Sequence, residues 1–162
     1  DRTSYLIASL SGIGDENSGF DMWDGLFEAY CFDLSNTITA DGQHQYTDIS
    51  IYSTLYPADL PQYMQNENWP AVNWLANNYS DFDGWTWEDL QQALWTLENN
   101  GYQYDPNSDE HGVSANLAMV NNMVATALAS SINGYQPMPG GWAAVVLEAG
   151  ETVQTIFTIV DP

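Results

Sequence analysis

The sequence predicts an α+β fold, in which a β-domain is interrupted by a helical insertion. Apolar and polar residues alternate, as they do in strands, near the beginning and the end of the chain. The middle instead repeats its apolar residues at helical spacing, in three stretches with recognisable start or stop signals. With 162 residues, of which 44% are hydrophobic, the chain is long enough for one domain with a real core. We expect a single domain over residues 1–162, with its β part at about 1–56 and 141–160 and a helical subdomain at about 57–140.

Two strands are expected at the start of the chain. Residues 4–10 and 26–34 have strand character, and a turn-rich stretch separates them. In the second strand, Cys31 stands between the aromatic residues Tyr30 and Phe32. Cys31 is the only cysteine in the sequence, so an internal disulfide cannot form.

Three further stretches complete the predicted β part. An Asp-Gly dipeptide at 41–42 is typical of a two-residue turn, so residues 37–52 are expected to form a hairpin. After the helical region, residues 142–147 and 153–160 again have strand character, with a turn at Ala149 and Gly150 between them.

The first and third predicted helices cover residues 68–79 and about 114–131. The first begins with Asn-Trp-Pro, and proline is tolerated in the first turn of a helix. The third has leucine and valine residues at helical spacing and ends before Asn133 and Gly134.

The second predicted helix, residues 87–99, has the clearest boundaries. Thr86 and Asp89 have the spacing of a capping box, and Asn100-Gly101 is a stop signal. Its apolar face consists of Trp87, Leu90, Leu94, Trp95 and Leu97. Gln91 falls within this apolar face, where a carboxamide must find hydrogen-bond partners. The opposite, solvent-facing side is expected to contain Glu88, Asp89, Gln92 and Thr96.

The charge of the chain excludes some classes of partner. The formal net charge is -21, Arg2 is the only basic residue, and lysine is absent. Binding to nucleic acid or to an anionic membrane is therefore not expected, because nothing would neutralise phosphate. Salt adaptation of the source organism would also explain this charge. No apolar run is long enough to span a membrane, and a chain that starts at Asp1 and ends in Asp161-Pro162 resembles one processed module of a longer protein.

Cys31 and Gln91 suggest one particular chemistry. A cysteine sulfur that attacks a glutamine carboxamide releases ammonia and leaves an internal thioester, a stored acyl group for an incoming nucleophile. Such a bond must be shielded from water, and aromatic walls of Tyr30, Phe32, Trp87 and Trp95 would suit it. The alternative is a buried inert cysteine and an unrelated buried glutamine.

Two motifs resemble those of the thioester domains of bacterial surface adhesins. The first is Tyr30-Cys31-Phe32-Asp33, which is similar to their aromatic-Cys-hydrophobic pattern. The second runs from Leu90 to Leu97 (LQQALWTL) and is similar to their hydrophobic-Gln pattern, with Gln91 at the glutamine. The Gly-Tyr-Gln-Pro and Pro-Gly bend at 134–140 also resembles that family.

This resemblance implies a β-sandwich or barrel with an inserted three-helix subdomain and a Cys31–Gln91 thioester. It also implies a module of an extracellular bacterial surface protein that attaches covalently to an amine, either a protein lysine or a polyamine. The reaction would be a single event rather than enzymatic turnover and would require no cofactor. The absence of lysine leaves the domain without a side-chain amine that could discharge its own thioester.

The remaining candidates lie in loops. His44 and His111 are candidates for proton transfer, since an attacking amine must be deprotonated. Asp105, Asn107 and Asp109 place oxygen ligands at alternate positions, as calcium loops do, and Asp81 and Asp83 form a second candidate of that kind. A non-covalent, calcium-stabilised binding domain and a cysteine hydrolase using Cys31 with a histidine are the alternative functions.

Overall fold

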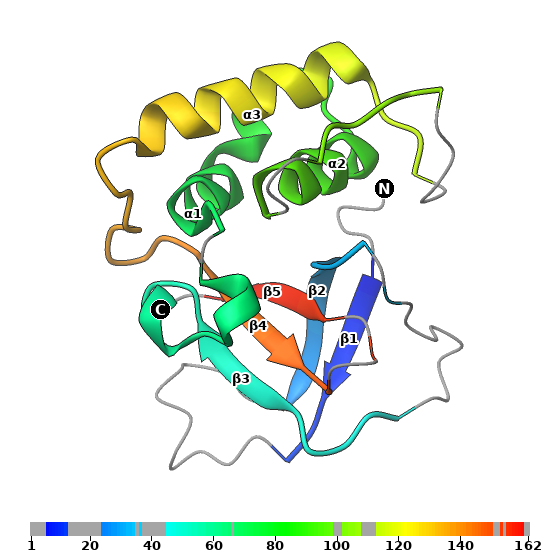
Figure 1. Cartoon of the computed structure of the whole chain (residues 1–162), viewed down its shortest axis with the longest axis vertical. Helices are drawn as coiled ribbons and strands as arrows, with labels where there is room; N and C mark the ends of the chain where they lie inside the picture. Colours follow the sequence, from blue (N-terminus) through cyan, green and yellow to red (C-terminus); the bar gives the residue numbers. More distant parts are fainter. Residues whose placement is uncertain are drawn as a thin grey trace.

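The chain folds into an antiparallel sheet covered on one face by helices. The computed structural model describes residues 6–12, 24–34, 36, 45–65, 67–98, 102–107, 113–150, 153 and 155–160. Figure 1 shows the sheet below and the helices above it, which confirms the predicted α+β class. The described strands form one open sheet with β1 and β3 at its two edges, so the expected closure into a sandwich or barrel is not seen among them.

The sheet has five strands in the order β1-β2-β5-β4-β3, and every neighbouring pair is antiparallel. The strands are β1 (Leu6–Leu10), β2 (Gly25–Cys31), β3 (Ser50–Ser53), β4 (Ala143–Glu148) and β5 (Ile156–Val160). The last strand of the chain lies between β2 and β4, which ties the two ends of the sequence together. The predicted hairpin is seen only as β3, because residues 37–44 lie outside the described residues.

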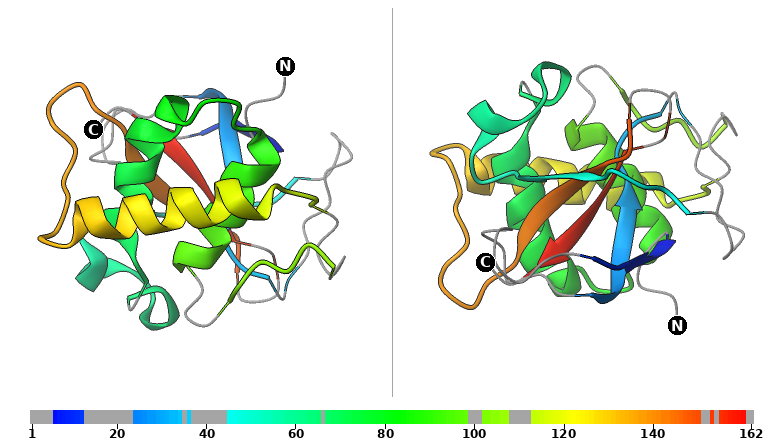
Figure 2. Two further views of the ribbon diagram at one scale, coloured as in Figure 1. Left: turned by 90° about the horizontal axis from the view of Figure 1, so that it is seen from above. Right: turned by 90° about the horizontal axis from the view of Figure 1, so that it is seen from below.

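Between β3 and β4 the described residues form three α-helices: α1 (Trp69–Asn78), α2 (Trp87–Glu98) and α3 (Leu117–Ser131). Figure 2 shows α3 crossing over α1 and α2 in the view from above, and the helices behind the sheet in the view from below. Short 3-10 turns at Pro57–Asp59 and Gln62–Met64 connect β3 to α1, and a third at Tyr79–Asp81 lies between α1 and α2. None of the helices in the described part of the chain is long and apolar enough to cross a membrane.

The helix starts follow from their capping residues. Thr86 and Asp89 form the predicted capping box: the Thr86 N–H donates to Asp89 Oδ2 at 3.0 Å, and the Asp89 N–H donates to Thr86 Oγ1 at 3.3 Å. The third helix begins at Leu117, later than predicted, because the Asn116 side chain caps it by accepting bonds from two backbone N–H groups of the first turn.

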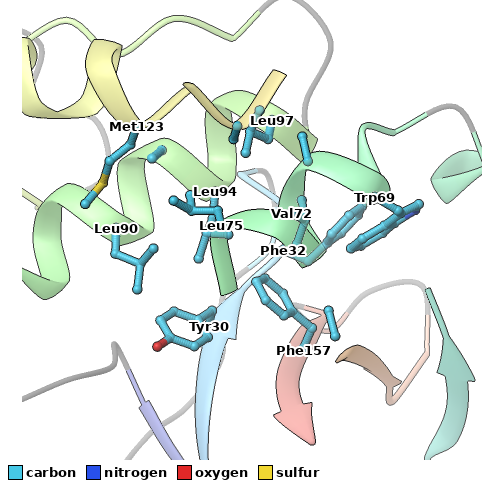
Figure 3. Close-up of a cluster of buried hydrophobic side chains, with 14 of the residues drawn as sticks. Tyr30, Phe32, Trp69, Val72, Leu75, Leu90, Leu94, Leu97, Met123 and Phe157 are labelled. Carbon is cyan, nitrogen blue, oxygen red and sulfur yellow. The ribbon is translucent and has the colours of Figure 1, made fainter. Parts of the chain in front are cut away.

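The main core lies between the sheet and the helices. Figure 3 shows its larger side chains, contributed by both layers: Tyr30, Phe32, Trp69, Val72, Leu75, Leu90, Leu94, Leu97, Met123 and Phe157. Tyr30 stacks on Phe157 with ring centroids 5.4 Å apart, and Phe32 stacks on Trp69 at 5.6 Å. A smaller cluster built on Leu10, Val145 and Leu147 forms a second core, so β4 is buried on both faces.

One prediction about α2 is wrong. Asp89 and Gln92 were expected on a solvent-facing side, but each is only 2% exposed. The reason is that α2 packs on the sheet on one side and against α3 and the segment before it on the other. Glu98, at the end of the helix, is fully buried. Almost the whole surface of α2 is therefore inside the protein.

Candidate functional site

The structure brings Cys31 and Gln91 together, although they are 60 residues apart in the sequence. The backbone N–H of Cys31 donates to Gln91 Oε1 at 3.1 Å, and Gln91 Nε2 donates to the backbone carbonyl of Cys31 at 3.0 Å. Both residues are buried, with 2% of Cys31 and none of Gln91 exposed. The two hydrogen bonds satisfy the buried carboxamide and fix its orientation beside the cysteine.

The end of β2 extends beyond the described part of β1, and this explains the contact. The N–H of Phe32 donates to the carbonyl of Thr155, beside β5, at 2.9 Å. Successive residues of a strand direct their N–H and C=O groups to opposite sides, so those of Cys31 point away from β5. On that side the described part of β1 ends at Leu6, which pairs with Ala29. The side chain of Gln91 therefore pairs with Cys31 as the backbone of a neighbouring strand would.

An apolar cluster surrounds Cys31. Its buried members are Cys31, Trp95 and Val113, and Leu6, Leu34, Trp87 and Tyr102 pack against them. The two tryptophans expected to wall the site therefore lie in this cluster. The side chains of Tyr30 and Phe32 instead belong to the main core, because neighbours along an extended chain point to opposite sides. Of the four aromatic residues expected to wall the site, Tyr30 and Phe32 therefore pack in the main core cluster rather than in this one.

The electrostatic environment keeps the Cys31 thiol protonated. Burial raises the pKa of Cys31 to about 12, and the acidic side chains of Glu98 and Asp33 add to this rise. A free thiolate nucleophile of the kind that cysteine hydrolases use is disfavoured here at neutral pH. Attack by this sulfur therefore requires a group that takes its proton.

Gln92, next to Gln91, has different partners. Its Nε2 donates to the carbonyl of Val113 at 2.8 Å, and its Oε1 accepts from the Tyr102 hydroxyl at 2.8 Å. These bonds tie α2 to the segment that leads into α3 and to the residues that follow α2. Of the two adjacent carboxamides, only that of Gln91 contacts Cys31.

The remaining candidates from the sequence are the two histidines and the residues of the proposed calcium loops. His44, His111 and Asp109 fall outside the described residues. Asp105 and Asn107 are exposed, and Asp105 Oδ1 accepts bonds from both the backbone and the side-chain nitrogen of Asn107 at 2.9 Å. These bonds lower the pKa of Asp105. Within the described ranges, no three acidic, cysteine or histidine residues are placed to hold a metal ion, Asp81 and Asp83 included.

Sequence reasoning missed Glu98. It is fully buried, and burial raises its pKa well above 4.5, with the charge of Glu67 adding to the rise. Its position, seven residues after Gln91, places it on the same side of the helix two turns later. That spacing is the signal by which the sequence points to it.

Solved structures of three bacterial surface domains are similar to this chain. The N-terminal domain of the Streptococcus pyogenes pilus tip adhesin Cpa has a TM-score of 0.56 and 13% identity, covering 97% of this chain and 92% of that one. The N-terminal thioester domain of a Clostridium perfringens surface protein, solved as a cysteine-to-alanine mutant, has a TM-score of 0.52 and 15% identity, covering 86% and 83%. The N-terminal thioester domain of the fibronectin-binding protein SfbI from Streptococcus pyogenes has a TM-score of 0.52 and 13% identity, covering 83% and 80%.

The fold is that of the thioester domains of bacterial surface adhesins. The resemblance inferred from the motifs around Cys31 and Gln91 is thus confirmed at the level of the fold. No protein-family profile and no curated protein matches the sequence itself. The thioester-domain fold is therefore recognised through structure, at 13–15% identity.

Proposed function

We propose that Cys31 and Gln91 form an internal thioester through which the domain acylates an amine on a target surface. In the first step the Cys31 sulfur bonds to Gln91 Cδ, the Cδ–Nε2 bond breaks, and the thiol proton leaves with the nitrogen as ammonia. In the second step an amine nitrogen bonds to Cδ, the sulfur leaves, and Cys31 regains its proton. The product is a stable amide between Gln91 and the target.

The observation that carries this proposal is the two-point hydrogen bonding between Gln91 and the backbone of Cys31. The N–H of Cys31 points at Gln91 Oε1, so it polarises the carbonyl and would stabilise the negative oxygen of a tetrahedral intermediate. The buried, largely apolar surroundings of Trp95 and Val113 would protect the thioester from hydrolysis. The shared thioester-domain fold agrees with this function.

The same proposal includes the location of the domain, its target and the number of times that it reacts. It is a module of a longer protein on the bacterial cell surface, its target carries a lysine amine or a polyamine, and each domain reacts once without turnover or cofactor. Stored acyl chemistry of this kind suits adhesion, because one covalent bond resists forces that non-covalent contacts do not.

The intact mass of the purified domain tests the proposal. Wild type is expected to be lighter than its sequence by one ammonia, and Cys31→Ala and Gln91→Ala are expected to have their full sequence masses. Gln92→Met is the matched control: it removes the adjacent carboxamide, preserves volume, and is expected to keep the ammonia loss. A full-mass wild type with a titratable thiol would contradict the thioester.

The reaction with an amine tests the second step. Incubation with methylamine is expected to add one amine to Gln91 and to release one thiol at Cys31, as located by peptide mass mapping. Two alternatives predict other results: an inert binding domain would not react, and a cysteine hydrolase would turn over an ester substrate repeatedly.

A further inference from the structure

Glu98 is a buried carboxyl group that the proposed reaction does not yet use. It is fully buried, and neither of its carboxyl oxygens has a hydrogen-bond partner among the described residues. A buried polar group without partners destabilises a protein by about 1–3 kcal/mol, and more for a charged group. A carboxyl retained under these conditions calls for an explanation other than stability.

The position of Glu98 connects it to Cys31. Gln91, Trp95 and Glu98 follow one another at spacings of four and three residues, so they lie along one side of α2. Trp95, in the middle, packs in the same cluster as Cys31. Of the acidic side chains that raise the pKa of the Cys31 thiol, Glu98 has the larger effect and Asp33 the smaller.

Two other acidic groups, one near Cys31 in the sequence and one in the first turn of α2, have structural roles. Asp33 accepts from the Asn36 N–H with one oxygen and from the Thr155 N–H with the other. Asp89 accepts from Thr86 and from the Asn116 N–H. The described residues include no histidine, lysine or arginine, so the proton acceptors available to Cys31 within them are carboxyl groups and tyrosines.

We propose that Glu98 is the proton-transfer group for thioester formation between Cys31 and Gln91, an inference that rests on the proposed function. One oxygen of the neutral carboxyl group takes the thiol proton as Sγ bonds to Cδ. The other oxygen gives its proton to Nε2 as the Cδ–Nε2 bond breaks, and ammonia leaves. The carboxyl group ends with one proton, as it began, and no charge is created in the apolar site.

The environment of Glu98 suits this role. Burial and the neighbouring charge of Glu67 raise its pKa, which keeps the carboxyl group protonated to a higher pH than an exposed glutamate. The titratable groups that act on it within the described chain are Glu67, just before α1, and Cys31, at the end of β2. Neither supplies a positive charge that would favour the ionised form.

The test follows thioester formation during refolding. Chain purified from inclusion bodies in denaturant is refolded by dilution over a series from about pH 5 to about pH 9 and quenched at intervals. Intact mass then gives the fraction that has lost one ammonia, and far-UV circular dichroism confirms folding. Glu98→Gln preserves the shape of the side chain and is expected to slow ammonia loss by at least about 10²-fold, as for other positioned acid–base groups.

The pH profile separates proton transfer from a structural role. In wild type the rate is expected to fall as pH rises through the pKa of Glu98, since only the neutral carboxyl group has a proton to give. In Glu98→Gln this fall is absent. Glu67→Gln, which leaves Glu98 in place but removes the neighbouring charge, is expected to move the fall to lower pH.

Each outcome has a distinct meaning. Ammonia loss from Glu98→Gln at the wild-type rate would overturn the role of Glu98 and leave the thioester intact. A wild type that keeps its full mass at every pH would overturn the thioester and this role together. If Glu98→Gln does not fold, the pH profile of Glu67→Gln decides. A fall in the rate of ammonia loss that moves to lower pH supports the role of Glu98, and a fall at the wild-type pH overturns it.

Discussion

Two adjacent carboxamides on α2 illustrate how the immediate surroundings of a residue determine its chemistry. Gln91 and Gln92 have the same side chain, and both are buried. Gln91 bonds to the backbone of Cys31, so its carboxamide is fixed at the residue that carries the sulfur. Gln92 bonds to Val113 and Tyr102, so it joins two segments and bonds to no part of Cys31 in the described structure. The proposed reaction therefore depends on which backbone the carboxamide pairs with, and only Gln91 pairs with that of Cys31.

At the residue scale, Glu98 is expected to make stability depend on pH. Its pKa is raised in the folded state, so the unfolded chain loses this proton first as pH rises above 4.5. The contribution of Glu98 to stability is present below that pH and is lost as pH rises toward its folded pKa. Glu98→Gln, which cannot ionise, is expected to gain stability over the parent by up to about 1.4 kcal/mol for each pH unit in this window.

Urea denaturation of Glu98→Gln and its parent at several pH values measures their difference in stability. Both proteins carry Cys31→Ala, so a thioester cannot contribute to either. The overall charge of the chain affects both alike, and only their difference reports on Glu98. A difference that stays constant from acidic to neutral pH would contradict the raised pKa.

At the scale of elements, Asp89 joins two helices. One oxygen accepts from Thr86 at the start of α2, and the other accepts from the Asn116 N–H, just before α3, at 2.7 Å. Asp89→Ala removes the cap and leaves the Asn116 N–H without this partner, so we expect a loss of about 2–4 kcal/mol in the free energy of unfolding. Asn116→Ala, which removes only the α3 cap, is expected to lose about 1 kcal/mol.

Chemical denaturation of both variants tests this ranking. Asp89→Asn is the conservative control, because its side-chain oxygen can still accept one of the two bonds. Its free energy of unfolding is expected to lie between those of wild type and Asp89→Ala. Equal losses for Asp89→Ala and Asn116→Ala would show that the contact between the two helices adds nothing to stability.

At the scale of the whole molecule, the net charge of -21 is expected to make stability depend on salt. Carboxylates that repel one another destabilise the compact state, and about 0.15 M salt already screens exposed charges more than about 8 Å apart. The melting temperature is therefore expected to rise gradually with sodium chloride. A calcium site at Asp105, Asn107 and Asp109 would instead give a steep rise at low calcium concentration, since a ligand that binds only the folded state stabilises by mass action.

Melting curves in sodium chloride and calcium chloride at matched ionic strength distinguish the two effects. Identical curves would argue against the calcium site and for screening alone. A steep calcium effect that Asp105→Asn abolishes would support the site. Neither result affects the thioester proposal, which depends on Cys31 and Gln91.

The local features of this protein can be predicted from its sequence. Period-two and helical patterns identified the α+β class, the capping box defined the start of α2, and the apolar arc singled out Gln91 as a carboxamide in need of partners. These features depend on residues close together in the chain, whose geometry is set by backbone periodicity. The resemblance of the motifs to thioester domains predicted the fold that the comparisons then showed.

How the elements cover one another depends on long-range packing. The structure places β5 between β2 and β4, pairs the backbone of Cys31 with the side chain of Gln91, and buries Gln92 and Glu98 on a helix whose sequence predicts a solvent-facing side. Periodicity identifies one apolar face of a helix, but whether a second face is covered depends on segments distant in the sequence. The burial of Asp89, Gln92 and Glu98 follows from that long-range packing, which no local pattern encodes.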